Sequence, residues 1–112
     1  MEEKENLTIE EVIELIRKIN YERMEIYMDP FYAIDNITFM HNYGLDDIDV
    51  KNIVKELTVD DLIKGPVDDY NSDKFIYPCW IFLKFVKGLR IKVYIKLKVI
   101  NHNTKVLIYK IH

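Results

Sequence analysis

The clearest pattern of hydrophobic and polar positions lies in residues 91–99, which read IKVYIKLKV. Every odd position of this segment is apolar, whereas the even positions hold Lys92, Tyr94, Lys96 and Lys98. Strict alternation of this kind predicts a β-strand with one buried face. The other face would carry three ammonium groups and a phenol, with same-face neighbours about 6.6 Å apart. Because like charges at that spacing repel each other, this lysine face needs an explanation.

Two further strands are expected around this one. The segment 77–86 also alternates, and we assign Trp80, Phe82 and Lys84 to the same face as the lysines. Lys87-Gly88 and the segment 101–104 are typical of hairpin turns. Residues 105–112 then complete a three-strand antiparallel meander that ends at His112, beside the strand with the lysines.

The earlier part of the chain has helical periodicity. A capping-box pattern at Thr8 and Glu11 precedes an amphipathic helix that ends near residue 20. A short strand is predicted over 23–28, and helices are predicted over 36–44, 49–57 and 59–64. We therefore expect an α+β fold, with the helices packed on a small antiparallel sheet, and a single domain over 1–112.

The charges are distributed unevenly along the chain. Residues 1–73 contain all 19 acidic residues and seven basic ones, a balance of −12, whereas residues 74–112 contain nine basic residues and no acidic one, a balance of +9. Such asymmetry favours a polyanionic partner for the basic part. Acidic helices that neutralise a basic sheet within one fold would have the same composition.

The lysine face combines aromatic rings with cations, a mixture that suits single-stranded nucleic acid because bases stack on rings and phosphates contact cations. The candidate RNA-binding residues on this face are Trp80, Lys84, Lys92 and Lys98. The alternative is an ordinary solvated face, on which lysines protect edge strands from aggregation. The absence of acidic residues over 74–112 favours binding.

Other chemistry has less support in the sequence. The single cysteine, Cys79, excludes an intramolecular disulfide and a cysteine zinc cluster, and its inward position predicts a buried apolar side chain rather than a nucleophile. The three histidines are scattered, so we expect no metal and no cofactor. The acidic N-terminal segment resembles no secretory signal, and the longest apolar run, 75–83, is too short for a membrane helix. A cytoplasmic protein without membrane contact is expected.

Four segments taken in order resemble the MqsR family of toxins, which are RelE-like endoribonucleases of bacterial type II toxin–antitoxin systems. The segments are LTVDDLIKGPVDDY (57–70), WIFLK (80–84), GLRIKVYIKLKV (88–99) and VLIYKIH (106–112). The resemblance covers most of the chain. It implies a RelE-like fold, metal-independent cleavage of single-stranded mRNA, and a cognate antitoxin that binds the toxin in a hetero-oligomer.

The resemblance also implies a set of catalytic residues. The family's catalytic lysine after the short helix corresponds to Lys64, its tyrosine to Tyr94, and the lysine two residues later to Lys96. The family's lysine near the chain end is replaced by His112, which still supplies a group for proton transfer. A glutamine that contacts the substrate in some members is replaced by Ile81, so no cleavage sequence can be carried over.

In such toxins the ribose 2′-OH attacks the adjacent phosphate and leaves a 2′,3′-cyclic phosphate and a 5′-OH. This reaction needs a base, an acid, and cations for the crowded phosphorane. We expect His112 and Tyr94 to transfer protons and Lys64 and Lys96 to stabilise charge. The alternative function is a non-catalytic module on the same fold that binds RNA or an acidic protein through the basic sheet.

Overall fold

The computed structural model describes residues 7–31, 33–67 and 78–112. These residues form three α-helices and two short 3₁₀ turns, namely α1 (Ile9–Lys18), α2 (Ile34–Tyr43), α3 (Asp47–Lys55), η1 (Tyr21–Arg23) and η2 (Val59–Asp61). They also form five strands: β1 (Met24–Ile26), β2 (Leu62–Val67), β3 (Cys79–Val86), β4 (Ile91–Ile100) and β5 (Lys105–Ile111). The end of the 57–70 segment and the first residue of the predicted strand 77–86 lie outside the described residues.

The five strands form one sheet in the order β1-β5-β4-β3-β2. Strands β3, β4 and β5 are the predicted antiparallel meander, and the α+β fold is confirmed. The prediction of a purely antiparallel sheet is wrong, because β1 pairs with β5 in parallel. A parallel pair needs a long connection, and here most of the chain, from β1 through α2, α3 and the meander, provides it.

The predicted helix start at Thr8 is confirmed in atomic detail. The Glu11 backbone N–H donates to Thr8 Oγ1 at 3.1 Å, and the Thr8 N–H donates to Glu11 Oε1 at 2.8 Å. The following stripe of Val12, Ile13 and Ile16 is buried against the sheet. Because the capping box satisfies backbone donors that have no partner within the helix, it fixes where α1 begins.

The predicted helix over 59–64 is wrong, since only Val59–Asp61 form a 3₁₀ turn and Lys64 lies in strand β2. The capping box between Thr58 and Asp61 stabilises this one turn. The chain then pairs with β3 as strand β2. Gly65 allows the two strands to approach closely, because a Cβ atom at this position would lie only 3.0 Å from Trp80 Cα. The close contact explains a glycine at φ +143° inside a strand.

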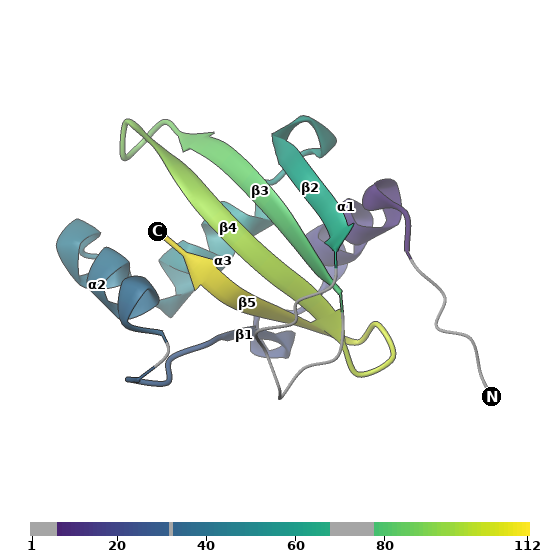
Figure 1. Ribbon diagram of the computed structural model, residues 1–112, viewed down its shortest axis with the longest axis horizontal. Helices are drawn as coiled ribbons and strands as arrows, with labels where there is room; N and C mark the ends of the chain where they lie inside the picture. The colour runs from purple at the N-terminus through teal and green to yellow at the C-terminus, as the bar shows by residue number, and fades with distance from the viewer. Residues whose placement is uncertain (1–6, 32, 68–77) are drawn as a thin grey trace.

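Two layers make up the molecule (Figure 1), with α1 and α3 behind the sheet. We call the sheet surface against these helices the back face and the opposite surface, turned to the viewer in Figure 1, the front face. The back face of β4 holds Val93, Ile95 and Leu97, which are fully buried as the alternation predicted. No helix among the described residues has the length and apolar character that a membrane crossing requires.

The prediction that Trp80 and Phe82 share a face with the lysines is wrong. Trp80 lies opposite Leu97 and Phe82 opposite Ile95, so both rings belong to the back face and are buried. Strand β3 is apolar on both of its faces, and alternation alone therefore could not orient it. The orientation found in the structure buries the indole and the phenyl ring, which contribute more apolar area than the residues they alternate with.

Candidate functional site

The front face is built from cross-strand rows, because residues directly opposite each other in antiparallel strands share a face. Along β4 the front-facing residues are Lys92, Tyr94, Lys96 and Lys98. Their partners on β3 are, in the same order, Phe85, Leu83, Ile81 and Cys79. The burial of the odd positions of β4 confirms that its lysines and Tyr94 lie on the face away from the helices.

Tyr94 and His112 form the row of this face between those of Lys92 and Lys96. The Tyr94 N–H donates to the His112 carbonyl at 2.8 Å, and the His112 N–H donates to the Tyr94 carbonyl at 3.0 Å. Their rings are stacked with centroids 5.0 Å apart and an interplanar angle of 29°. Tyr94 is half-buried and His112 is exposed. The structure therefore brings together the two residues that we predicted to transfer protons.

The next row contains three lysines. Lys64 on β2 lies opposite Ile81, Ile81 lies opposite Lys96, and Lys96 lies opposite Lys110 on β5. With about 4.8 Å between neighbouring strands, the Lys64 and Lys96 backbones are about 9.6 Å apart. All four predicted catalytic residues thus lie on the front face in two adjacent rows. Lys110 completes the row, although the sequence did not single it out.

A β-bulge on β5 adds aromatic rings that the sequence analysis missed. Lys96 pairs with Lys110 and Leu97 with Ile108, so Tyr109 is an extra residue between them. The Lys96 and Lys98 Nζ atoms lie 5.3 and 5.0 Å from the centroid of the Tyr109 ring, close enough for cation–π attraction. The Tyr27 ring stacks on Tyr109 at 5.2 Å. No sequence signal marked this bulge.

The buried side chain of Asn36 on α2 holds the bulge in place. Its Nδ2 donates to the carbonyls of Tyr27 at 2.9 Å and Tyr109 at 3.0 Å, and its Oδ1 accepts the Ile111 N–H at 2.8 Å. One carboxamide therefore satisfies three backbone groups at the point where β1 and β5 leave regular pairing. It fixes the backbone directly before His112.

The four predicted RNA-binding residues divide into two groups. Lys92 is exposed on the front face, as predicted. The predicted face is wrong for Trp80, which is only 4% exposed on the back face, and for Lys84, which lies on the back face 3.7 Å from Asp61 Oδ2. Lys98 lies on the predicted front face but is 0% exposed. The register between β3 and β4 places Trp80 and Lys84 on the back face, whereas Lys98 is buried within the front face.

Phe85 supplies the exposed ring that we had assigned to Trp80. It lies opposite Lys92 on the front face and is 56% exposed. Its neighbour on this face, Leu83, is 38% exposed. The signal in the sequence was the apolar character of both faces of 79–86, from which the larger rings, Trp80 and Phe82, could have been assigned to the core.

Some of the charge asymmetry is neutralised within the fold. Lys105 Nζ lies 2.6 Å from Glu25 Oε1, and Lys84 pairs with Asp61. Both pairs join a basic residue of the C-terminal strands to an acidic residue of the earlier part of the chain. Cys79 is buried, as predicted for an apolar side chain.

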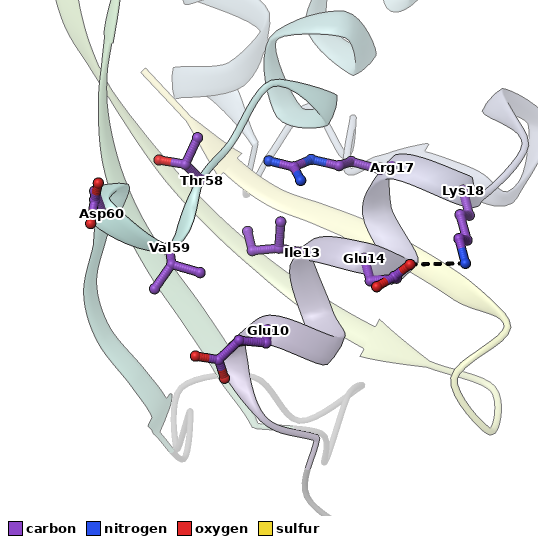
Figure 2. Close-up of a pocket in the computed structure, with 8 residues that line it drawn as sticks. All are labelled: Glu10, Ile13, Glu14, Arg17, Lys18, Thr58, Val59 and Asp60. Atoms are coloured by element: carbon purple, nitrogen blue, oxygen red, sulfur yellow. Dashed lines mark ion pairs between the residues drawn. The ribbon is translucent and has the colours of Figure 1, made fainter.

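A separate groove of about 500 Å³ lies between α1 and η2 (Figure 2). Glu10, Glu14 and Asp60 line it together with Arg17 and Lys18. The Glu14 and Lys18 side chains are 2.8 Å apart, and their hydrogen bond and mutual attraction lower the pKa of Glu14 and raise that of Lys18. Because its charges are mixed and its lining residues are unconnected to the Tyr94–His112 row, we assign it no part in the site.

Within the described ranges, no three His, Cys, Asp or Glu side chains gather as metal ligands would. Among the described residues of the front face, Tyr94, Lys96 and His112 offer a phenol, an ammonium group and an imidazole. No family model, no curated protein and no solved structure matches this chain. The functional assignment therefore rests on the geometry of the front face and on the sequence patterns.

Proposed function

We propose that this protein is an endoribonuclease that cleaves single-stranded mRNA without a metal ion, as the resemblance to MqsR toxins implies. The observation that carries the proposal is the stacked, backbone-paired Tyr94 and His112, with Lys96 in the next row of the same face. An imidazole, a phenol and an ammonium group within two neighbouring rows are the groups that cleavage by the 2′-OH needs.

In the proposed reaction the ribose 2′ oxygen attacks the adjacent phosphorus and the bond from phosphorus to the 5′ oxygen breaks. His112 takes the proton of the 2′-OH, and Tyr94 gives a proton to the departing 5′ oxygen. Lys96 and Lys64 stabilise the negative charge of the phosphorane from the row beside them. The products are a 2′,3′-cyclic phosphate and a 5′-OH, so no water is consumed in this step.

Substrate binding in this proposal uses the exposed end of the front face. Lys92 is placed to contact a phosphate, and the Phe85 ring opposite it offers a surface on which a base can stack. This arrangement replaces the contacts that we expected from Trp80 and Lys84. It favours unpaired RNA, because stacking on a side chain requires a base that is free of its own helix.

The test is single-turnover cleavage of a single-stranded RNA in the presence of EDTA. Replacing His112 by alanine should lower the cleavage rate by roughly 10²–10⁴, the usual contribution of a general acid or base, and should leave RNA affinity nearly unchanged. His41→Ala, at an exposed position of α2, is the matched control and should cleave at the parent rate. Equal rates for the parent and His112→Ala would contradict the assignment.

The resemblance extends the proposal to a partner. We propose a toxin that a cognate antitoxin neutralises in a hetero-oligomer within the cytoplasm. Expression of the chain without an antitoxin should then arrest bacterial growth, and His112→Ala should relieve the arrest. A parent chain that is harmless at high expression, or a chain that binds RNA without cutting it, would instead indicate a non-catalytic binding module.

A further inference from the structure

The bulge at Tyr109 changes the register between β4 and β5 by one residue. Between the hairpin turn and the bulge, Leu97 lies opposite Ile108. Past the bulge, the backbones of Tyr94 and His112 exchange two hydrogen bonds. If the first register continued without the extra residue, Tyr94 would instead lie opposite the residue before His112. Because side chains alternate between the two faces of a sheet, this shift would move His112 to the back face.

The core explains why the chain takes the register past the bulge. In the structure Ile111 lies opposite Ile95, and both side chains are fully buried on the back face. Without the bulge, Lys110 would lie opposite Ile95 and its ammonium group would enter the core. Burial of such a charge is costly, so the burial of Ile111 favours the register that also brings His112 to the front face.

The side chain of Asn36 spans the bulge from the outer edge of β5. The parallel pairing of β1 with β5 reaches as far as Ile108. Beyond it, Asn36 Nδ2 donates to the Tyr109 carbonyl at 3.0 Å, and Oδ1 accepts the Ile111 N–H at 2.8 Å. Asn36 therefore takes the place of a neighbouring strand where the bulge interrupts the ladder, and it contacts the residue directly before His112.

We propose that Asn36 is a positioning residue of the cleavage reaction, because it holds the bulge that places His112 beside Tyr94. This inference rests on the proposed RNA-cleaving function. Asn36 is 1% exposed, so it acts on the reaction through His112 and not by contact with RNA. Since a displacement of about 1 Å can cost about 100-fold in rate, the loss of Asn36 should slow the chemical step and spare RNA binding.

The first measurement is single-turnover cleavage of single-stranded RNA in EDTA, at a temperature where every variant is folded. Asn36→Ala should lower the rate by about 100-fold and change the affinity for an uncleavable 2′-O-methyl RNA by less than about 3-fold. Asn36→Ser, whose hydroxyl keeps one donor where the carboxamide has two, should lower the rate by about 10-fold and replaces Asn36→Ala if that chain does not fold.

Ile16→Ala is the matched control for lost stability. It opens a cavity in the buried stripe of α1, and its expected cost in stability is similar to that of Asn36→Ala. It should cleave at the parent rate, because it leaves β5 untouched. An equal loss of rate in Ile16→Ala would overturn the positioning role, since any loss of stability would then have the same effect.

The second measurement reads the place of His112 without any reaction. In the parent, NMR should show a cross-strand nuclear Overhauser effect between the amide protons of Tyr94 and His112, because the two backbones form a hydrogen-bonded pair. Asn36→Ala, or Asn36→Ser in its place, should lose this signal, and Ile16→Ala should keep it. A signal of parent strength in the Asn36 variant would overturn the proposal.

A double variant tests whether Asn36 acts through His112. If it does, the chain with both Asn36→Ala and His112→Ala should cleave within about 3-fold of the rate of His112→Ala alone, because coupled residues are not additive. A further drop of about 100-fold would show that Asn36 affects the reaction by another route, and would overturn the proposal.

The two proposals fail in different ways. If the parent leaves natural RNA intact, the nuclease function is wrong, and the NMR signal alone decides whether Asn36 holds His112 beside Tyr94. If the parent cleaves RNA and Asn36→Ala cleaves it at the same rate, the nuclease function stands and the positioning role is wrong.

Discussion

At the scale of single residues, Asn36 has the largest structural role that the sequence did not reveal. Its replacement by alanine removes the hydrogen bonds that its side chain makes with the Tyr27 and Tyr109 carbonyls and the Ile111 N–H. Since each buried unsatisfied group costs about 1–3 kcal/mol, Asn36→Ala should lower the free energy of unfolding by about 3 kcal/mol. Asn20→Ala, at an exposed position with no side-chain capping bond, is the control for urea denaturation and should change stability by less than about 0.5 kcal/mol.

The variant Asn36→Asp adds a test that depends on pH. A carboxylate at this position would face two carbonyl oxygens, and burial would raise the pKa of the new carboxyl group above its usual value of about 3.9. The folded state would then bind a proton that the unfolded state releases, so the variant should be most stable in acid and lose stability as the pH rises through the folded pKa. A stability profile parallel to that of the parent would show that Asn36 does not hold these carbonyls.

The prediction of which face a residue occupies succeeded where one strand had a polar and an apolar face. Strand β4 is such a strand, and the positions of Lys92, Tyr94 and Lys96 followed from alternation alone. It failed for Trp80 and Lys84, because β3 is apolar on both faces and its register is decided by how much ring surface the core can bury. The burial of Lys98 could not be predicted, since alternation gives the face of a residue and not what lies over it.

At the scale of elements, Lys55 links α3 to the end of α1. Its Nζ donates to the carbonyls of Ile16 at 2.8 Å, Arg17 at 3.2 Å and Ile19 at 2.5 Å, which have no partner within the helix. Burial lowers the pKa of Lys55, so desolvation offsets part of the gain from these bonds. Lys55→Met keeps most of the apolar stem and should reduce the free energy of unfolding by about 1–2 kcal/mol.

Lys51→Met, one turn earlier on α3, provides the comparison for this prediction. Chemical denaturation of both variants measures the difference. If the two substitutions cost the same, the capping of α1 by Lys55 contributes nothing measurable to stability.

The start of α1, the end of α2 and the hairpins were predictable because their signals are local, whereas the starts predicted at residues 36 and 49 lie two residues inside α2 and α3. The capping box at Thr8 and the left-handed Gly44 that ends α2 depend on residues within one turn. The extra strand β2 and the parallel pairing of β1 could not be predicted from local signals, since both depend on a partner strand far away in the sequence. The resemblance singled out Lys64 without fixing its local structure, which was predicted as helix and is a strand.

At the scale of the whole molecule, the uneven charge of the sequence becomes a difference between two layers. The early helices α1 and α3, which carry acidic residues in their first turns, lie on one side of a sheet whose C-terminal strands carry the lysines (Figure 1). The ion pairs of Lys84 and Lys105 show that neutralisation within the fold accounts for part of the asymmetry.

The central claim is that this face cleaves RNA through the ribose 2′-OH. The most direct measurement compares one single-stranded RNA with the same RNA carrying a single 2′-deoxy nucleotide at the position of cleavage, both in EDTA, with the product ends identified by mass spectrometry. We expect a 2′,3′-cyclic phosphate and a 5′-OH from the first RNA and no cleavage at the deoxy position of the second. Cleavage of the deoxy-substituted RNA at that position, or products with a 3′-OH and a 5′-phosphate, would contradict it.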